Sequence, residues 1–254
     1  MPTLTLPPAW HHVHLPKTDS TMLALRRSPL AERVRVLSSA NEALLLTTDF
    51  QTAGRGQRGT SWEAAAGENI LFGFALRPQG LRAQQQFVLS EMLALSVALA
   101  LDEYVDGVSV KWPNDIYVGD RKICGMLLEH DLCGNSIDTT ITGVGINVNQ
   151  QSFCSDAPNP VSLFQLLGHT TSRTTLVETI IRNFSRMYHD ADEEKVHATY
   201  CSRLFRREGL HRWRDRDGEF LASIDGVGAD GLLSLRRTDG DVRTYAFKEV
   251  AYLL

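Results

Sequence analysis

Residues 108–148, VSVKWPNDIYVGDRKICGMLLEHDLCGNSIDTTITGVGINV, carry the pattern that decides the fold. Turn residues separate four apolar, β-prone runs, at Val108–Trp112, Ile116–Val118, Lys122–Leu128 and Ile137–Val148. Gly119 and Asp120 form a two-residue hairpin signal, and Gly134 and Asn135 mark a later turn. Consecutive strands joined by such short turns pair antiparallel. The stretch therefore predicts an antiparallel sheet.

Helical patterns flank this stretch and do not interrupt it. The strongest is Ala83–Val105, where Phe87, Met92, Leu95 and Leu99 recur at helical spacing. Further helices are expected at Met22–Arg27, Thr174–His189 and Asp192–Arg207, and further strands at Trp10–Leu15, Ala43–Asp49 and Asn69–Leu76. Strands grouped apart from helices predict the α+β class, with a mixed or antiparallel sheet and flanking helices.

The pattern changes after Leu210. Short strands are expected at Glu219–Ile224, Leu232–Arg237 and Val242–Phe247, separated by Asp-Gly turns. This spacing is typical of a small all-β module. We therefore expect two domains, 1–208 and 209–254.

Composition excludes several classes of protein. The chain has 254 residues, of which 43% are hydrophobic, so it can bury a core without disulfides or metal. Its net charge of -4 argues against a dominant nonspecific nucleic-acid binder. The most apolar stretch, Phe87–Leu101, contains Glu91 and is too short to span a bilayer. We expect a soluble cytoplasmic protein with no membrane and no nucleic-acid partner.

The cysteines and histidines indicate no metal site. The four cysteines stand outside C-x-x-C pairs, so we expect reduced thiols, with Cys124 as a packed residue and not a nucleophile. His11, His12 and His14 are close in sequence, but their spacing on a strand is not expected to bring them together on a metal.

The loop Gly54-Arg55-Gly56-Gln57-Arg58-Gly59 fits G-x-G-x-x-G. A dinucleotide-binding loop needs a helix immediately afterwards, but a strand begins by Asn69 and leaves no room for one. Two interpretations remain. Open glycine backbone and two arginines suit a phosphate-bearing ligand, and they equally suit a solvated surface loop.

Three further features each allow a structural and a functional interpretation. Lys111–Ile116 reads KWPNDI, which is either a tight turn or part of a site. Arg121–Gly125 places Lys122 either beside an anionic ligand or on an ordinary edge strand. Gly143–Asn149 has alternate glycines that either leave space above a sheet or form a bulge.

Taken in order, these features resemble the biotin protein ligase family. The resemblance begins at Asp19-Ser20-Thr21 and includes Trp62, and its Gly/Arg loop and KWPND segment are specific to the family. It covers nearly the whole chain, since the family also carries a C-terminal SH3-like β-barrel. It implies a class II synthetase-like catalytic fold. Only eighteen residues precede Asp19, so we expect the short form without an N-terminal DNA-binding domain.

The resemblance implies an ATP-dependent ligase. Such an enzyme forms biotinyl-5′-AMP and transfers biotin to a lysine of a biotin carboxyl carrier protein, a subunit of acetyl-CoA carboxylase or of another biotin-dependent carboxylase. The ligands implied are biotin, ATP and Mg²⁺, with the metal held largely by phosphates and not by a protein site. Some relatives pair through the central sheet, so a homodimer is an open alternative.

The resemblance also implies roles for particular residues. Biotin's ring would be held by Ser20, Thr21 and Gln51 next to Met22, and the ligand would be wrapped by Gly54, Arg55, Gly56 and Gln57. The adenylate would be covered by Trp62, and the nucleotide side would include Lys111, Asn114 and Asn147. Lys122 would hold the carboxylate, with Gly125 against the ligand. The catalytic set would be Lys122, Arg55, Arg58 and Asp115, the last orienting the incoming lysine.

Three positions depart from the family pattern. Met22 stands where asparagine is usual, Gln57 where a second arginine is frequent, and the expected last strand, Val250–Leu254, lacks a terminal arginine. We expect these changes to alter binding strength and not the reaction. Three rival functions remain: a lipoate–protein ligase or octanoyltransferase, a biotin-responsive repressor, and a noncatalytic binding protein with a degenerate site. The Gly/Arg loop and the KWPND segment favour biotin over lipoate, and the retained Arg55, Arg58 and Lys122 favour catalysis.

Overall fold

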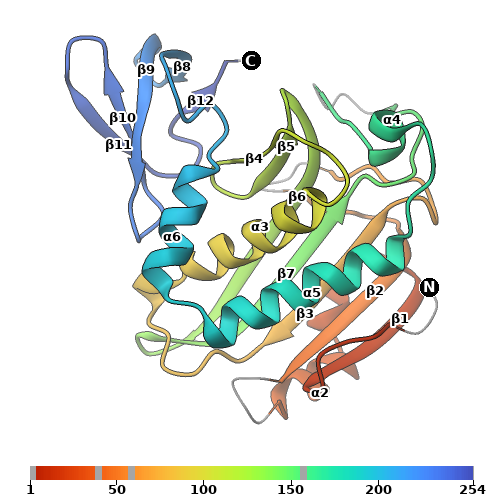
Figure 1. The fold of residues 1–254 in the computed structure, drawn as a ribbon. Coiled ribbons are helices and arrows are strands. Elements are labelled where there is room, and N and C mark those ends of the chain that lie inside the picture. Colours follow the sequence, from red (N-terminus) through yellow and green to blue (C-terminus); the bar gives the residue numbers. More distant parts are fainter. Residues whose placement is uncertain (1–3, 38–41, 57–60, 155–158, 254) are drawn as a thin grey trace.

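The chain forms two β-sheets. The computed structural model describes residues 4–37, 42–56, 61–154 and 159–253. Within these ranges a seven-stranded sheet crosses the larger part of the molecule, and a five-stranded sheet lies at one end (Figure 1). The larger sheet has the strand order β1 (Trp10–Thr18), β2 (Ala43–Gln51), β3 (Ile70–Leu76), β7 (Ser136–Ile146), β6 (Arg121–Cys133), β5 (Asp115–Val118) and β4 (Val108–Lys111).

The pairing of these strands confirms the expected mixed sheet. β1 runs parallel to β2, and every other neighbouring pair is antiparallel. The strands expected from residues 108–148 are all present. β6 and β7 form the longest pair, which continues to a turn at Gly134 and Asn135. β6 is longer than its apolar run because pairing extends into exposed polar residues near the turn, whereas β7 ends at Ile146, before the expected Val148.

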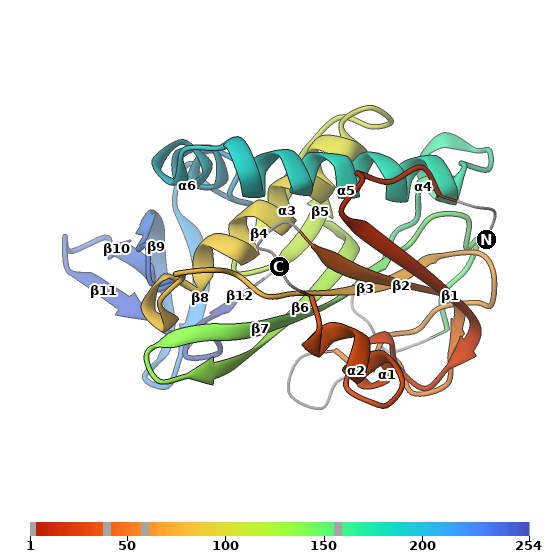
Figure 2. The ribbon, with the colours of Figure 1, turned by 90° about the horizontal axis from the view of Figure 1, so that it is seen from below.

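Helices cover both faces of the larger sheet. Figure 2 shows α3 (Phe87–Leu101) and α5 (Arg173–Asp190) on one face, and α1 (Thr21–Leu25) and α2 (Leu30–Arg35) on the other. The alternation of side chains along β2 produces two cores. Leu45 packs in the core that includes α3 and α5, whereas Leu44 and Leu46 pack with Leu25 of α1. The helices α2 and α4 (Leu163–Leu167) were not expected, because each is too short for a helical period to show.

The expected helix at Ala83–Val105 is confirmed with different ends. A 3₁₀ turn at Ala83–Gln85 precedes α3, which ends at Leu101. The stretch expected to be too short for a membrane is α3 itself, but together with the preceding turn the segment Ala83–Leu101 has the length and composition of a helix that could cross one. Of the most apolar part of this segment, 72% is buried inside the protein, as in the central helix of a packed core.

One carboxylate lies within this apolar helix. Glu91 is buried, and its Oε1 lies 2.6 Å from Nδ1 of His197 on α6 (Glu193–Ser202). Burial raises the pKa of Glu91, and the histidine opposes that effect. The pair therefore ties α3 to α6 and supplies the partner that a buried acidic group requires.

The C-terminal sheet has five antiparallel strands within the described residues. Their order is β11 (Val242–Tyr245), β10 (Leu233–Arg237), β9 (Gly218–Val227), β8 (His211–Asp215) and β12 (Ala251–Tyr252). The sequence predicted β9, β10 and β11, and β12 lies within the last strand that it predicted, at Val250–Leu254. The strand β8 reads HRWRD, in which Trp213 alone is fully buried, so its polar neighbours hid the pattern. A small β module at this position is confirmed.

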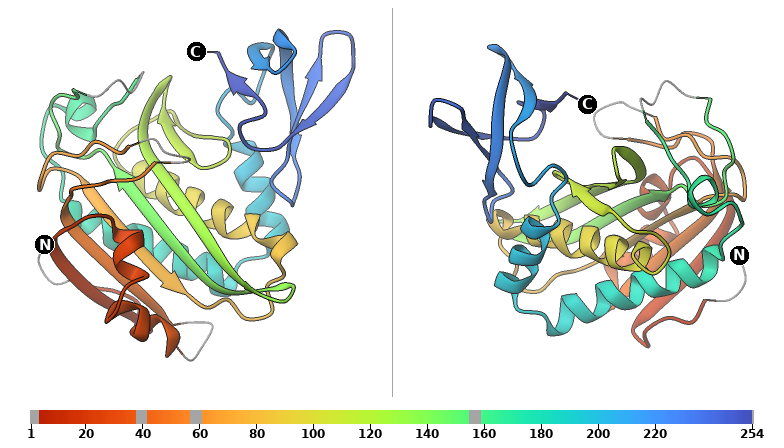
Figure 3. Two further views of the ribbon diagram at one scale, coloured as in Figure 1. Left: turned by 180° about the vertical axis from the view of Figure 1, so that it is seen from behind. Right: turned by 45° about the horizontal axis from the view of Figure 1, so that its top comes forward.

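Direct contacts join this module to the larger sheet. Figure 3 shows the module at the opposite end of the molecule from β1. Nε1 of Trp112 donates a hydrogen bond of 2.9 Å to the Gly231 carbonyl, and the ring of Phe87 packs closely over the same glycine. The ring of Trp112 also meets Phe247 edge-on at a centroid distance of 6.0 Å. The segment after β4 is thus held between the two sheets.

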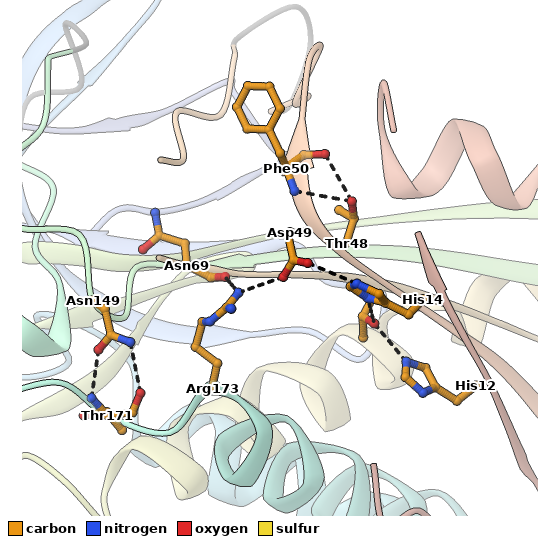
Figure 4. A network of polar contacts seen from close by, with 10 residues as sticks. His12, His14, Thr48, Asp49, Phe50, Asn69, Asn149, Thr171 and Arg173 are labelled. Atoms are coloured by element: carbon orange, nitrogen blue, oxygen red, sulfur yellow. Dashed lines mark hydrogen bonds and ion pairs between the residues drawn. The ribbon is translucent and has the colours of Figure 1, made fainter. Parts of the chain in front are cut away.

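A polar network ties β1 and β2 to the start of α5 (Figure 4). His12 Nε2 and His14 Nδ1 lie 2.8 and 3.0 Å from Oγ1 of Thr47. Asp49 then accepts contacts from His14 at 3.1 Å and from Arg173 at 3.3 Å. His12 and His14 share one face of β1 and therefore meet at one hydroxyl group, a contact that the sequence did not predict. Among the described residues, no group of three or more His, Cys, Asp or Glu side chains is arranged to hold a metal.

The network makes stability depend on pH. Burial, aided by neighbouring His14, lowers the pKa of His12, so the unfolded chain takes up this proton at a higher pH than the folded chain. Folding free energy is therefore lost as pH falls through about 6.5, the ordinary histidine pKa. We expect His12→Gln to weaken this loss, as measured by urea unfolding at several pH values on either side. The exposed neighbour His11 provides the control, and His11→Gln should keep the wild-type pH dependence. Equal slopes for all three proteins would contradict the assignment.

Candidate active site

A cavity of about 230 Å³ opens where the larger sheet, the segment before α1 and the C-terminal module meet. Its walls include ten of the residues that the sequence predicted: Ser20, Thr21, Met22, Gln51, Arg55, Gly56, Trp62, Asp115, Lys122 and Gly125. These residues come from six separate segments of the chain. The fold therefore brings most of the predicted set together.

One end of the cavity is polar and buried. Ser20 and Thr21 are 2% and 3% exposed, and the Thr21 backbone N–H donates 2.8 Å to Oε1 of Gln51. Ser20 occupies the N-cap position of α1, but its side chain makes no capping hydrogen bond. Asp19 instead accepts from the Ser20 N–H at 2.7 Å. The hydroxyl groups and the amide at this end suit a ligand with both donors and acceptors.

Three glycines form part of the floor of the cavity. Gly143 and Gly145 alternate along β7, and Gly125 lies opposite Gly145 on β6. A Cβ at Gly143 would lie 2.7 Å from Cγ of Met22, and one at Gly145 would lie 2.5 Å from Nε1 of Trp62. The glycines thus make room for larger side chains above the sheet, and neither position shows a bulge in the β6–β7 register.

Trp62 lies directly on this floor. A Cβ at Gly125 would come within 2.9 Å of its ring, and its buried Nε1 has no hydrogen-bond partner in the described part of the chain. Its backbone N–H donates 3.0 Å to the Gly54 carbonyl, which closes the base of the loop. From the sequence we expected Gly125 to lie against the ligand and Trp62 to cover the adenylate. In the structure Trp62 itself covers Gly125, and Gly54 lies outside the cavity lining.

An ion pair stands at the centre of the cavity. Lys122 Nζ lies 2.7 Å from Oδ2 of Asp115, and both side chains are roughly 30% exposed, at 31% and 29%. A register shift between Ile116 and Tyr117 in the β5–β6 pairing places Asp115 opposite Gly125. Lys122 also lies 5.8 Å from the centre of the Trp62 ring. In such a pair the cation can bind an anionic ligand, and the adjacent carboxylate can accept a proton from a group that reacts with that ligand.

Lys111 lies away from the cavity, although the sequence placed it with the nucleotide. Its Nζ contacts Oη of Tyr117 at 3.1 Å and lies over the rings of Tyr117 and Tyr252, at 4.9 and 5.2 Å. Burial lowers the pKa of Lys111, an effect that Asp115 opposes. Tyr252 belongs to the C-terminal module, so Lys111 holds the two sheets together through cation–π contacts.

The two asparagines expected at the nucleotide also lie outside the cavity lining. Asn114 donates 2.6 Å to the Met126 carbonyl and lines an adjoining groove. Asn147 follows Gly143 and Gly145 at the same alternate spacing, and its Nδ2 donates 3.1 Å to the Val161 carbonyl. Its Oδ1 is buried without a partner among the described residues. An orphaned acceptor of this kind suits a ligand with an amino group.

Some predicted residues remain outside the described ranges, and the cavity also contains residues that were not predicted. Gln57 and Arg58 belong to the first group. The second group includes Phe247 and Lys248 of the C-terminal module. No local pattern could have revealed them, because they reach the cavity only through packing between the two sheets. Cys124 is fully buried, and burial raises its pKa, which agrees with the expected packed thiol.

The glycine floor yields a direct prediction. Gly145→Ala places a methyl group against the Trp62 ring, so we expect a loss of roughly 1–3 kcal/mol in unfolding free energy, measured by urea titration. The matched control is Gly226→Ala, where an added Cβ meets nothing within 4 Å. Trp62→Ala in the Gly145→Ala background should recover most of the loss. A loss that is independent of Trp62 would contradict the packing described above.

The chain resembles proteins of known family. Residues 18–147 match the sequence model of the Biotin/lipoate A/B protein ligase family. The bifunctional ligase/repressor BirA of Escherichia coli is 30% identical over 249 residues, covering 93% of this chain and 72% of BirA. The biotin--[acetyl-CoA-carboxylase] ligase of Paracoccus denitrificans is 29% identical, covering 86% of this chain and 95% of its own length. The chain spans 66% of the length of BirA from Bacillus subtilis, with 29% identity over 82% of the chain.

Solved structures show the same fold. The biotin protein ligase of Aquifex aeolicus, solved in complex with biotin and ATP, has a TM-score of 0.74 at 23% identity, covering 95% of this chain and 97% of its own. The Leishmania major enzyme with biotinyl-5-AMP has a TM-score of 0.63 at 22% identity, covering 94% and 99%.

The predicted fold class, a mixed sheet with flanking helices and a small C-terminal β module, is thereby confirmed. The family match extends over more than half of the 254 residues, and the Escherichia coli relative is matched over most of its length. The chain belongs to the biotin/lipoate A/B protein ligase family.

Proposed function

We propose that this protein is a biotin protein ligase, which activates biotin as biotinyl-5′-AMP and transfers it to a lysine of a carrier protein. The observation that carries the proposal is the Lys122–Asp115 pair beside the polar end formed by Ser20, Thr21 and Gln51. Relatives named biotin--[acetyl-CoA-carboxylase] ligase support biotin over lipoate within the family.

Biotin lies between the polar end of the cavity and Lys122, above the side chains of Met22 and Trp62 that cover the glycines. Its ureido ring has two N–H donors and one carbonyl acceptor, which match the hydroxyl groups of Ser20 and Thr21 and the amide of Gln51. The ring is neutral, so polar groups without charge are sufficient there. Met22 packs on Gly143 at this end and supplies apolar contact. The valeryl chain then leads its carboxylate toward Lys122.

The first step joins biotin to the nucleotide. A carboxylate oxygen of biotin attacks the α-phosphorus of ATP, an O–P bond forms, and the bond to the β-phosphate bridging oxygen breaks. Negative charge grows on the phosphate oxygens, where Lys122 and Arg55 stabilise it. The family resemblance implies that Arg58 lies beside the same phosphates. Arg58 itself is outside the described ranges. Catalysis here is by positioning and charge.

The second step transfers biotin to the carrier. The lysine amine of the carrier attacks the acyl carbon, a C–N bond forms, and the bond to the phosphate oxygen breaks to release AMP. Asp115 accepts a proton from the attacking amine, because its carboxylate stands beside the cation that holds the reacting carboxyl group. Lys122 then stabilises the departing phosphate.

Asn147 and Trp62 serve the nucleotide. The unpartnered Oδ1 of Asn147 accepts a hydrogen bond from the adenine amino group, and the Trp62 ring offers an apolar surface that excludes water from the mixed anhydride. Mg²⁺ is held mainly by the phosphates of ATP. Phosphate oxygens are sufficient for this, because Mg²⁺ usually binds through substrate phosphates and water and not in an all-protein site.

The partner is the biotin carboxyl carrier protein of a carboxylase, and the proposal includes no nucleic acid and no membrane. The reaction needs ATP, so the cytoplasm is the proposed location. The division into domains 1–208 and 209–254 is kept as a proposal. A homodimer through the larger sheet would use an edge such as β1, which pairs only with β2.

The activity is tested by incubating the protein with ATP, Mg²⁺, biotin and an apo-carrier domain, followed by a streptavidin blot. We expect biotin label on the carrier. The proposed function would be overturned if the wild-type protein failed to label a carrier that another ligase can biotinylate. Lys122→Ala should reduce biotinyl-5′-AMP formation by about 10²-fold or more. Lys195→Ala, an exposed lysine on α6, is the control and should match wild type.

Asp115→Asn separates the two steps. The amide keeps the shape of the carboxylate but accepts no proton, so we expect transfer from preformed biotinyl-5′-AMP to slow by about 10²-fold or more. Adenylate formation, measured as biotin-dependent pyrophosphate release, should fall less. Equal loss in both steps would show that Asp115 acts by holding Lys122 and not as a proton acceptor.

A further inference from the structure

Lys248 has an unusual backbone for its residue type. Among the described non-glycine residues only Arg206 and Lys248 have positive φ, at 56° and 72°. Arg206 has a clear structural partner, since its Nη1 donates 2.8 Å to the Leu253 carbonyl. In the described ranges Lys248 has no ion-pair partner, and its ammonium lies 5.8 Å from the ring centre of Phe247.

The turn that carries Lys248 is firmly held. The Glu249 N–H donates 3.0 Å to the Ala246 carbonyl, and Oε2 of Glu249 accepts from the Ala246 N–H at 2.8 Å. Lys248 is therefore the third residue of a four-residue turn, where positive φ favours glycine or asparagine. Phe247 packs on Trp112 and fixes the turn against the larger sheet. The lysine is held in place at a conformational cost that packing does not explain.

This turn forms one wall of the cavity. Phe247 and Lys248 line it together with Arg55 and the Lys122–Asp115 pair. Arg55, Gly56 and Phe247 also line the adjoining groove, so this is the side on which the cavity opens outward. The polar end at Ser20 is buried, and the buried acceptor of Asn147 lies outside the cavity lining. Lys248 itself is exposed, at the mouth.

We propose that Lys248 binds the β- and γ-phosphates of ATP and stabilises the pyrophosphate that leaves in the first step. The inference rests on the proposed function. Within the cavity Lys122 already has Asp115 as a partner, whereas the Lys248 cation faces the mouth without one. The β- and γ-phosphates are the part of the ligand that must depart through the mouth. A strained residue at a functional site is retained when its side chain is needed there.

The variants separate charge from strain. Lys248→Gly removes the cation and suits the positive φ, so it should unfold at the same urea midpoint as wild type or a higher one. Lys248→Arg keeps a cation on the same strained backbone. Arg216→Gln removes a cation that is 93% exposed at the β8–β9 turn and serves as the control.

The steady-state measurement is biotin-dependent pyrophosphate release. For Lys248→Gly we expect KM for ATP and the inhibition constant of pyrophosphate to rise by about tenfold, the effect of losing one charge-assisted contact. KM for biotin and the rate of transfer from preformed biotinyl-5′-AMP, which carries no β- or γ-phosphate, should stay at wild-type values. Lys248→Arg should restore the ATP and pyrophosphate constants, and Arg216→Gln should leave every constant unchanged.

Two outcomes would overturn the role of Lys248. One is an unchanged KM for ATP in Lys248→Gly, and the other is a transfer rate that falls as much as the overall rate. Calorimetric titration of each protein with inorganic pyrophosphate tests the contact without turnover. If wild type binds pyrophosphate more tightly than Lys248→Gly but releases none from ATP and biotin, the proposed function fails and the phosphate contact stands. Equal binding by the two proteins overturns the contact.

Discussion

The site depends on three glycines on one face of β6 and β7, where larger residues would collide with the side chains above the sheet. Gly125 and Gly145 lie opposite each other, and Gly143 continues the same face of β7. Any larger residue there would meet Trp62 or Met22 at less than van der Waals distance. The bare face allows an aromatic ring to rest on the sheet, and a ligand can approach the backbone of the two strands. The glycines thus leave room for the site on this face, whereas α3 and α5 pack a dense core against the opposite face.

The chemistry is added to this face by a local irregularity. The register shift in the β5–β6 pairing brings Asp115 to Lys122 in a place where a regular hairpin would pair different residues. The end of β4 and the residue after it also anchor the C-terminal module. Trp112 donates a hydrogen bond to Gly231, and Lys111 lies over the ring of Tyr252. One short stretch therefore supplies the acid group of the site and anchors the wall that closes it.

The sequence was sufficient for the class of fold, because strands with short turns are local patterns, whereas most of the cavity residues were grouped through the resemblance to a known family. It placed Ser20, Gln51 and Lys122 correctly together. It could not place Lys111, because a lysine beside a motif looks the same whether it faces a ligand or two tyrosines. It could not find Phe247 or Lys248, or the strand β8, since these depend on packing between the sheets. The convergence of His12 and His14 was missed because the hydroxyl that joins them lies on a different strand.

The position of Phe247 and Lys248 has a consequence for synthesis of the protein. The cavity begins with residues near position 20 and receives its last wall from a turn at 246–249. A ribosome makes the chain from the N-terminus, so the larger sheet can pair while the final wall is still inside the exit tunnel. The nascent protein then has the glycine floor and the Lys122–Asp115 pair, but no barrier between them and water. The cavity acquires its full lining only after the residues of this turn have left the ribosome.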